Sequence, residues 1–143
     1  MLKKATTFFL RLIIPVICVA IIAATISFIV VRTKYLYGLT GNSNQLRYMT
    51  WGRLFYANAF YYLLVTIFYI LLLSLFGTNI NSLKKKIYLG VLLSITIQLL
   101  SLLAVGKNIF NHPGSLILLL ISFSIGGAMI AYIDNKVLKL TGN

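Results

Sequence analysis

The side chains best suited to catalysis are scarce in this sequence, which contains one cysteine, one histidine and one acidic residue: Cys18, His112 and Asp134. Cys18 lies in the first apolar run, His112 in a short polar link, and Asp134 at the far end of the last apolar run. A helix over that last run would separate His112 from Asp134 by roughly 30 Å, so they could not act together within one chain. Paired cysteines, paired carboxylates and a glycine-rich phosphate loop are also missing from the sequence. We therefore expect a non-enzymatic protein without a metal or cofactor.

Asp134 has a structural explanation instead. If the apolar runs cross a membrane in succession, Asp134 lies at the same depth as Arg11 in the first run. An arginine and a carboxylate at this depth can form a charge-assisted hydrogen-bonded pair. The sequence thus predicts an Arg11–Asp134 ion pair that ties the first helix to the last, in preference to a proton relay.

Other polar side chains recur at helical spacing within two apolar runs. Each set has steps of four, four and three residues, which places its members on one helical face. The members are Asn58, Tyr62, Thr66 and Tyr69 in one run and Ser94, Gln98 and Ser101, preceded by the small residue Gly90, in the other. They predict a polar seam between the two helices, in which the amides of Asn58 and Gln98 form interhelical hydrogen bonds of about 0.5–2 kcal/mol each. A narrow transport path is the alternative, but the charges, repeats or broken helices typical of ion paths are not evident.

The elements that must position these residues are membrane helices. The chain is 60% hydrophobic and 10% charged, and its mean hydropathy is +0.97. Its apolar residues gather into runs of the length that crosses a bilayer, at about 8–31, 54–76, 87–105 and 115–133. We expect an all-α membrane protein with one domain, 1–143, whose four transmembrane helices form an up-down bundle. Pro15 predicts a mild kink or a helix start, and Pro113 suits the first turn of the last helix.

The net charge of +12 comes from basic residues at the ends of these runs. The side holding both termini and the second connection contains Lys3, Lys4, Arg11, Lys84, Lys85, Lys86, Lys136 and Lys139. The other side contains Arg32, Lys34, Arg47, Arg53 and Lys107. The positive-inside rule therefore predicts cytoplasmic termini. We expect contact with anionic lipid headgroups and no binding of nucleic acid, because the charges form no continuous basic face.

Two further groups predict contacts. Small residues four apart let helices approach closely in lipid, and they predict packing faces at Ala20, Ala24, Ser27, Ser122 and Gly126. In the predicted outer loop, 32–53, basic and aromatic residues suit interfacial anchoring or contact with a lipid or protein partner, namely Arg47, Tyr48, Trp51 and Arg53. The cluster Lys84, Lys85 and Lys86 could contact a partner on the cytoplasmic side.

These features favour a membrane subunit, anchor or sensor of a larger complex, which includes the possibility of toxin immunity or defence. The alternative is a small oligomeric channel, flippase or transporter. We expect a homo-oligomer or a hetero-complex with a cytosolic or membrane partner, because four short-looped helices leave polar faces to cover. The high content of Ile, Leu, Lys, Asn, Phe and Tyr suggests a bacterial source and thus the inner membrane.

Overall fold

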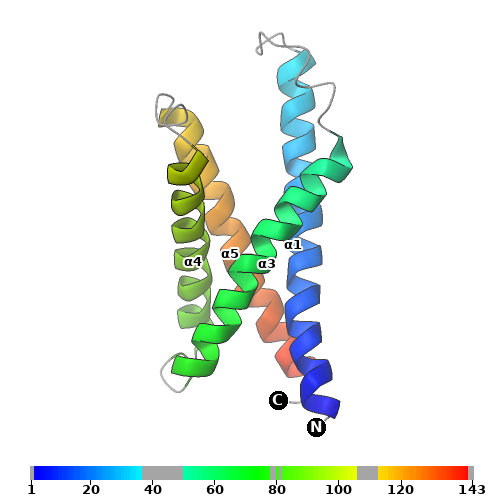
Figure 1. The fold of residues 1–143 in the computed structure, drawn as a ribbon, viewed down its shortest axis with the longest axis vertical. Helices are drawn as coiled ribbons and strands as arrows, with labels where there is room; N and C mark the ends of the chain where they lie inside the picture. The colour runs from blue at the N-terminus through cyan, green and yellow to red at the C-terminus, as the bar shows by residue number, and fades with distance from the viewer. Residues whose placement is uncertain (1, 37–49, 78–79, 81, 106–112, 142–143) are drawn as a thin grey trace.

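The computed structural model describes residues 2–36, 50–77, 80, 82–105 and 113–141, and these residues form four helices and no strand. The helices are α1 (Leu2–Leu36), α3 (Trp51–Phe76), α4 (Leu83–Val105) and α5 (Pro113–Thr141). Consecutive helices run in opposite directions, so α1 begins and α5 ends at the same end of the molecule (Figure 1). We call this the terminal end, and α3 also ends and α4 begins there.

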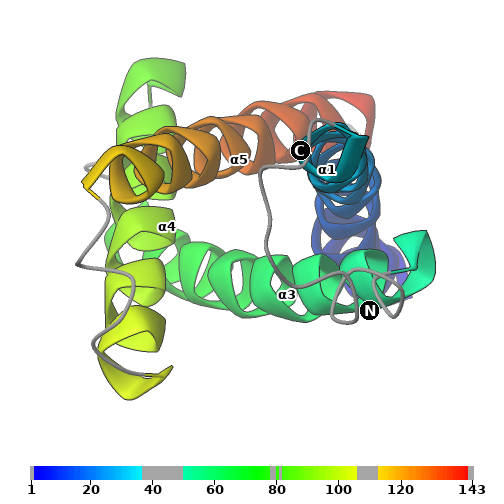
Figure 2. The ribbon, with the colours of Figure 1, turned by 90° about the horizontal axis from the view of Figure 1, so that it is seen from above.

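The four helices surround a common centre, with α3 opposite α5 and α1 opposite α4 (Figure 2). α3 runs diagonally, from the C-terminal half of α1 to the beginning of α4 at the terminal end (Figure 1). α5 follows the other diagonal, from the end of α4 to the beginning of α1. The most extensive contacts join α1 with α3 and α4 with α5, whereas α3 and α4 share a much smaller contact. α3 lies near α4 only at the terminal end and near α1 at the other end, so the two helices share a short contact.

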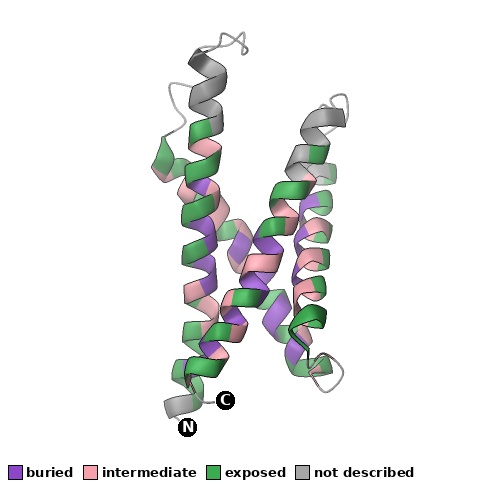
Figure 3. Ribbon diagram, turned by 180° about the vertical axis from the view of Figure 1, so that it is seen from behind, coloured by how far each residue is buried: buried purple, intermediate pink, exposed green. Residues whose placement is uncertain are grey.

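Two helices, α1 over Lys4–Ile29 and α3 over Trp51–Phe76, are long and apolar enough to cross a membrane. Large apolar side chains are exposed on the outside of all four helices, including Phe60 and Leu75, which are 67% and 73% exposed. Figure 3 shows buried residues where helices face one another and exposed ones on the outside. Such an apolar exterior is unusual for a monomeric soluble protein and typical of a surface in contact with lipid or protein.

The core is built from residues of α1, α3 and α5. Its fully or nearly buried members are Val19, Tyr62, Val65, Tyr69, Ile70, Leu73, Ile130 and Ala131. Side chains of α4, such as Leu89, Leu93 and Ile97, pack against this cluster while remaining partly exposed. α4 therefore contributes to the edge of the core and, through its small residues, to close contact with α5.

The helices extend beyond the apolar runs that predicted them. α1 begins at Leu2 and continues past Pro15 to Leu36, so the predicted helix start near Pro15 is wrong. Trp51 and Arg53, which we expected in the outer loop, form the first turn of α3. There the Thr50 hydroxyl accepts a hydrogen bond from the Arg53 backbone N–H at 3.3 Å. Helix ends are set by such caps, and not by the edge of the apolar run.

The same effect extends the helices at the terminal end. The Ser82 hydroxyl accepts a bond from the Lys85 backbone N–H at 3.3 Å, so the cluster Lys84–Lys86 lies in the first turn of α4 instead of in the connection. α5 begins at Pro113, as a proline in the first turn predicts, and continues through Asp134 to Thr141. Asp134 is therefore part of a helix surface that packs on its neighbours.

Candidate functional site

A paired arginine and aspartate join the first and last helices at the terminal end. Arg11 on α1 donates from Nε to Asp134 Oδ1 at 2.7 Å and from Nη2 to Oδ2 at 3.0 Å. The Asp134 side chain on α5 is fully buried, and that of Arg11 is 19% exposed. Two parallel hydrogen bonds between these planar groups fix both distance and orientation. The geometry thus holds α1 and α5 in one register.

A second polar contact lies one residue further along α5. Lys86 Nζ on α4 donates to Asn135 Oδ1 at 3.3 Å. Adjacent α5 residues, Asp134 and Asn135, therefore contact α1 on one side and α4 on the other. We call these four residues, Arg11, Lys86, Asp134 and Asn135, the terminal-end cluster. Its two basic members come from opposite sides of the molecule, whereas Lys84 and Lys85 are exposed.

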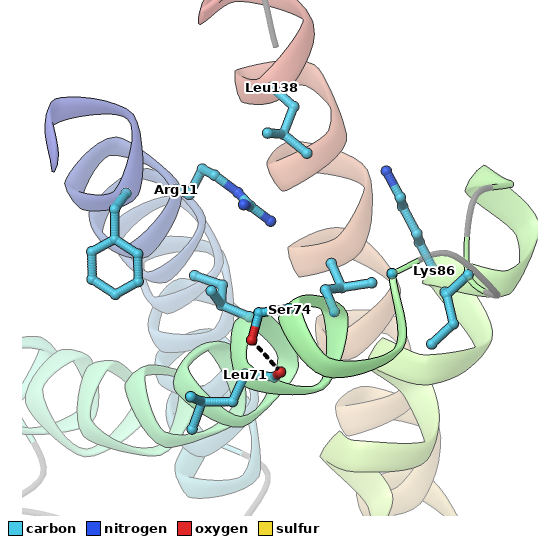
Figure 4. A pocket seen from close by; sticks show the side chains of 10 residues that line it. Arg11, Leu71, Ser74, Lys86 and Leu138 are labelled. Carbon is cyan, nitrogen blue, oxygen red and sulfur yellow. Dashed lines mark hydrogen bonds between the residues drawn. The ribbon is translucent and has the colours of Figure 1, made fainter. Parts of the chain in front are cut away.

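A pocket of about 420 Å³ opens between the two basic members of this cluster. Figure 4 shows Arg11 and Lys86 on different sides of the pocket, with Ser74 and Leu71 of α3 between them and Leu138 of α5 opposite. The Ser74 hydroxyl donates to the Leu71 carbonyl at 2.7 Å, so it is satisfied within its own helix. Apart from Arg11, Lys86, Ser74 and Gly77, the lining is apolar: Phe8, Ile70, Leu71, Leu73, Ile80 and Leu138.

The residues of the predicted polar seam face the interior, but most of their hydrogen bonds do not cross between helices. Tyr62, Thr66, Tyr69, Ser94 and Gln98 are buried, and Asn58 and Ser101 are half-buried. Asn58 donates to the Leu54 carbonyl at 2.7 Å, Thr66 to Tyr62 at 2.7 Å, and Ser101 to Gln98 at 2.8 Å. These donors are satisfied by the backbone of the preceding turn. Among the described residues, Asn58, which we expected to bond between helices, therefore bonds within its own helix, as do Thr66 and Ser101.

A residue outside the predicted seam makes the α3–α4 link. The Tyr61 hydroxyl donates to the Ser94 backbone carbonyl and lies 3.0 Å from Ser94 Oγ. The Tyr61 ring also contacts Phe123 of α5, with centroids 4.6 Å apart. Helical spacing from Asn58 places Tyr62 on the predicted seam and leaves Tyr61 off it. A long side chain one position away can still reach a neighbouring helix. The sequence feature that could have identified Tyr61 is the cluster of three tyrosines at 56–62.

The Tyr69 hydroxyl presents the opposite situation. Tyr69 is fully buried beside the Arg11–Asp134 pair, close enough to interact electrostatically with both groups. Among the described residues its hydroxyl has no hydrogen-bond partner. An unsatisfied buried hydroxyl destabilises a fold, so the ring of Tyr69 and not its hydroxyl accounts for its contribution to packing.

We expect phenylalanine substitutions at Tyr61 and Tyr69 to differ in their effect on stability. Tyr61→Phe removes an interhelical hydrogen bond and should lower the free energy of unfolding by about 1 kcal/mol. Tyr69→Phe removes an unsatisfied hydroxyl and should be neutral or stabilising. Reversible unfolding in detergent measures both, with the exposed Tyr56→Phe as the matched control. Equal destabilisation by the two changes would contradict this reading of the bonds.

Small residues bring α4 and α5 into backbone contact. A Cβ atom added to Gly127 would lie 2.7 Å from the Gly90 carbonyl carbon and 2.8 Å from Ser94 Cβ. One added to Gly126 would lie 2.6 Å from Tyr62 Cε1, so the α3 ring packs directly on this glycine. Ser122, predicted on the same packing face as Gly126, is exposed. The close approaches of α5 lie at Gly126, toward α3, and at Gly127, toward α4. In α1, Ala20 and Ala24 are fully buried and Ser27 is half-buried.

The end opposite the terminal end contains a small aromatic contact. Trp51 Nε1 donates to Thr25 Oγ1 of α1 at 3.2 Å, and the Trp51 ring stacks on Phe55 with centroids 5.4 Å apart. Trp51 and Arg53 are exposed on the first turn of α3. Arg47 and Tyr48, predicted to join them at an interface, lie outside the described residues. This contact joins α1 and α3 at the end of the molecule opposite the terminal end.

The described residues contain no group of three or more His, Cys, Asp or Glu side chains able to hold a metal ion. Cys18 is exposed on α1, Asp134 is engaged with Arg11, and His112 lies outside the described residues. No protein-family model, curated protein or solved structure matches the chain. The site is therefore interpreted from its own chemistry, which is that of a cationic, partly apolar pocket beside a structural ion pair.

Proposed function

We propose that the chain is a four-span integral membrane protein that acts through binding, as a non-enzymatic subunit, anchor or sensor of a larger membrane complex. The observation that supports this most directly is the use of Asp134. The only acidic side chain of the sequence is buried in a bidentate pair with Arg11, which leaves it to position helices and not to move protons. The exposed apolar residues on all four helices support a membrane setting.

The proposed orientation has both termini and the terminal-end cluster in the cytoplasm, in the inner membrane of a bacterium. It rests on the excess of basic residues on that side. In a Cys18→Ser background, we expect a cysteine at Thr50 to react with an impermeant maleimide on intact cells. A cysteine at Ser82 should react only after the membrane is permeabilised. The reverse labelling pattern would contradict the orientation.

The binding role is tested by the mass of the assembly. We expect the full chain, purified in mild detergent from its native membrane, to run as a homo-oligomer or to retain a second protein in fixed stoichiometry. Intact-mass measurement then gives the number of copies and the partner's mass. A stable monomer without a partner at any detergent concentration would contradict a subunit role.

The alternative of a channel or transporter receives less support. Thr66 and Ser101 give their hydroxyl protons to backbone carbonyls of their own helices, and Tyr62 packs its ring on Gly126. A path for ions or solutes would instead be lined by polar groups turned toward water. Flux through liposomes that contain the purified protein, lost on Gln98→Leu with the fold retained, would nevertheless favour transport over the subunit role.

A further inference from the structure

The pocket at the terminal end combines two kinds of lining, basic and apolar. Arg11 and Lys86 provide positive charge on different sides, and side chains such as Phe8, Leu71 and Leu138 provide apolar surface (Figure 4). A polar solute would gain nothing from the apolar part, and a hydrocarbon nothing from the charges. The lining therefore suits a molecule with an anionic group joined to an apolar one.

Both basic side chains retain donors for such a molecule. Asp134 accepts two of the five N–H donors of Arg11, from Nε and Nη2, and Asn135 accepts one of the three of Lys86. The same contacts hold the two side chains in place, which reduces the conformational entropy lost when a ligand binds. Arg11 and Lys86 are thus prepositioned donors and not freely moving surface groups.

The surrounding charge is positive as well. Lys84, Lys85, Lys136 and Lys139 are exposed on the same two helix segments that border the pocket, and the sequence has no acidic side chain other than buried Asp134. The charged side chains near the terminal end therefore attract an approaching anion, and none repels it. This charge complementarity selects a negatively charged ligand.

The apolar side of the pocket is continuous with surface that faces outward. Phe8 and Leu71, both pocket residues, are about half exposed on α1 and α3. In the proposed four-span arrangement, on which this inference rests, that surface contacts acyl chains. A chain of a bound lipid could then follow Phe8 and Leu71 while its phosphate remained at the level of Arg11 and Lys86.

We propose that this pocket binds one anionic phospholipid, whose phosphate is held between Arg11 and Lys86 and whose acyl chain lies along Phe8 and Leu71. The lipid would occupy the space that the tilted α3 leaves between α1 and α4. It would thus become part of the contact that holds the four helices together at the terminal end.

Native mass spectrometry of the full chain in detergent tests the proposal, with phosphatidylglycerol as the probe and phosphatidylcholine as the uncharged comparison. We expect a one-lipid adduct that favours phosphatidylglycerol. Lys86→Gln should reduce its binding constant about five-fold, the effect of roughly one basic residue at an anionic membrane surface. Lys84→Gln removes the same charge from the same turn but does not line the pocket, and it should have less than about half that effect on a logarithmic scale.

A second pair of variants separates the pocket from general charge. Ser74→Phe fills the pocket without altering charge, and the Ser74 hydroxyl it removes donates to the Leu71 carbonyl of its own helix. It should weaken the phosphatidylglycerol adduct. Thr96→Phe is the matched control, because the Thr96 hydroxyl makes the same kind of bond, to Leu92, on an exposed face outside the pocket. It should leave the adduct unchanged.

Three results would overturn the proposal: equal binding of the two lipids, equal effects of Lys84→Gln and Lys86→Gln, or displacement of the lipid by glycerol 3-phosphate at equal concentration. The last would identify a site for soluble phosphates. The same spectra report the mass of the protein assembly. If the lipid does not bind and the assembly is intact, the lipid proposal fails and the subunit role is retained. If the protein is a monomer that still binds the lipid, the subunit role fails and the lipid proposal is retained.

Discussion

Asp134→Asn is expected to lower the free energy of unfolding by about 3–5 kcal/mol, because it leaves the Arg11 guanidinium largely buried without its counter-charge. The amide can accept one hydrogen bond from Arg11 but cannot neutralise it. Reversible unfolding of the purified protein in detergent, followed by circular dichroism, measures the loss. A change below about 1 kcal/mol would contradict the structural role of the pair.

A double variant separates the loss of the ion pair from the cost of leaving one buried charge unpaired. Replacing both partners, as Arg11→Met with Asp134→Leu, removes the buried charges together and should recover most of the loss, since apolar replacements of buried pairs are often neutral or stabilising. Lys139→Gln, an exposed charge in the last turn of α5, is the control and should cost less than about 1 kcal/mol. If Asp134→Asn instead retained stability and abolished a proton-dependent activity, the relay hypothesis would replace the structural one.

Gly127→Ala should destabilise the α4–α5 contact by about 1–3 kcal/mol, although alanine is the better helix former. The added methyl group would overlap the Gly90 backbone and approach Ser94 Cβ. Because the overlap is with helix backbone and not with a flexible side chain, a local rearrangement cannot relieve it. The helices must separate, which loses packing along the most extensive interface of the fold. In the proposed four-span arrangement, lipid would supply no hydrophobic drive to restore it, so close packing would be the main source of that interface's stability.

The matched control for this prediction is Gly52→Ala. Among the described residues, a Cβ at Gly52, in the first turn of α3, would meet only Thr50 Oγ1 at 4.0 Å. Alanine there should be neutral or stabilising by up to about 1 kcal/mol, since it reduces the freedom of the unfolded chain. Unfolding in the same detergent compares the two variants. Stabilisation by both would show that α4 and α5 do not approach as closely as described.

The helices were predictable because each apolar run is long enough to exclude other structures, but their ends were not. Trp51 and Lys84 were assigned to connections since they are polar or interfacial, yet Thr50 and Ser82 cap helices that include them. A cap depends on one side chain and its local geometry, whereas an apolar run depends on composition. The number of helices therefore follows from the sequence more reliably than their lengths.

The Arg11–Asp134 pair was predictable from scarcity: one acidic residue at a given depth has few partners. The seam was predicted less well, because Thr66 and Asn58 can bond either across helices or to their own backbone, and spacing alone does not decide between them. The pocket was not foreseen. It lies where α3 crosses diagonally between α1 and α4, and that crossing depends on side-chain contacts between helices, such as the Tyr62 ring packed on Gly126.

The separation of the ion-pair partners along the chain has a consequence for biosynthesis. Arg11 and Asp134 are 123 residues apart, and synthesis proceeds from the N-terminus. Arg11 is therefore synthesised long before the carboxylate that pairs with it, and it stays without that partner until translation reaches Asp134. A polypeptide that stops before Asp134 has no acidic side chain with which Arg11 can pair. Formation of the pair is thus a late event, which requires that α5 has been synthesised at least as far as Asp134.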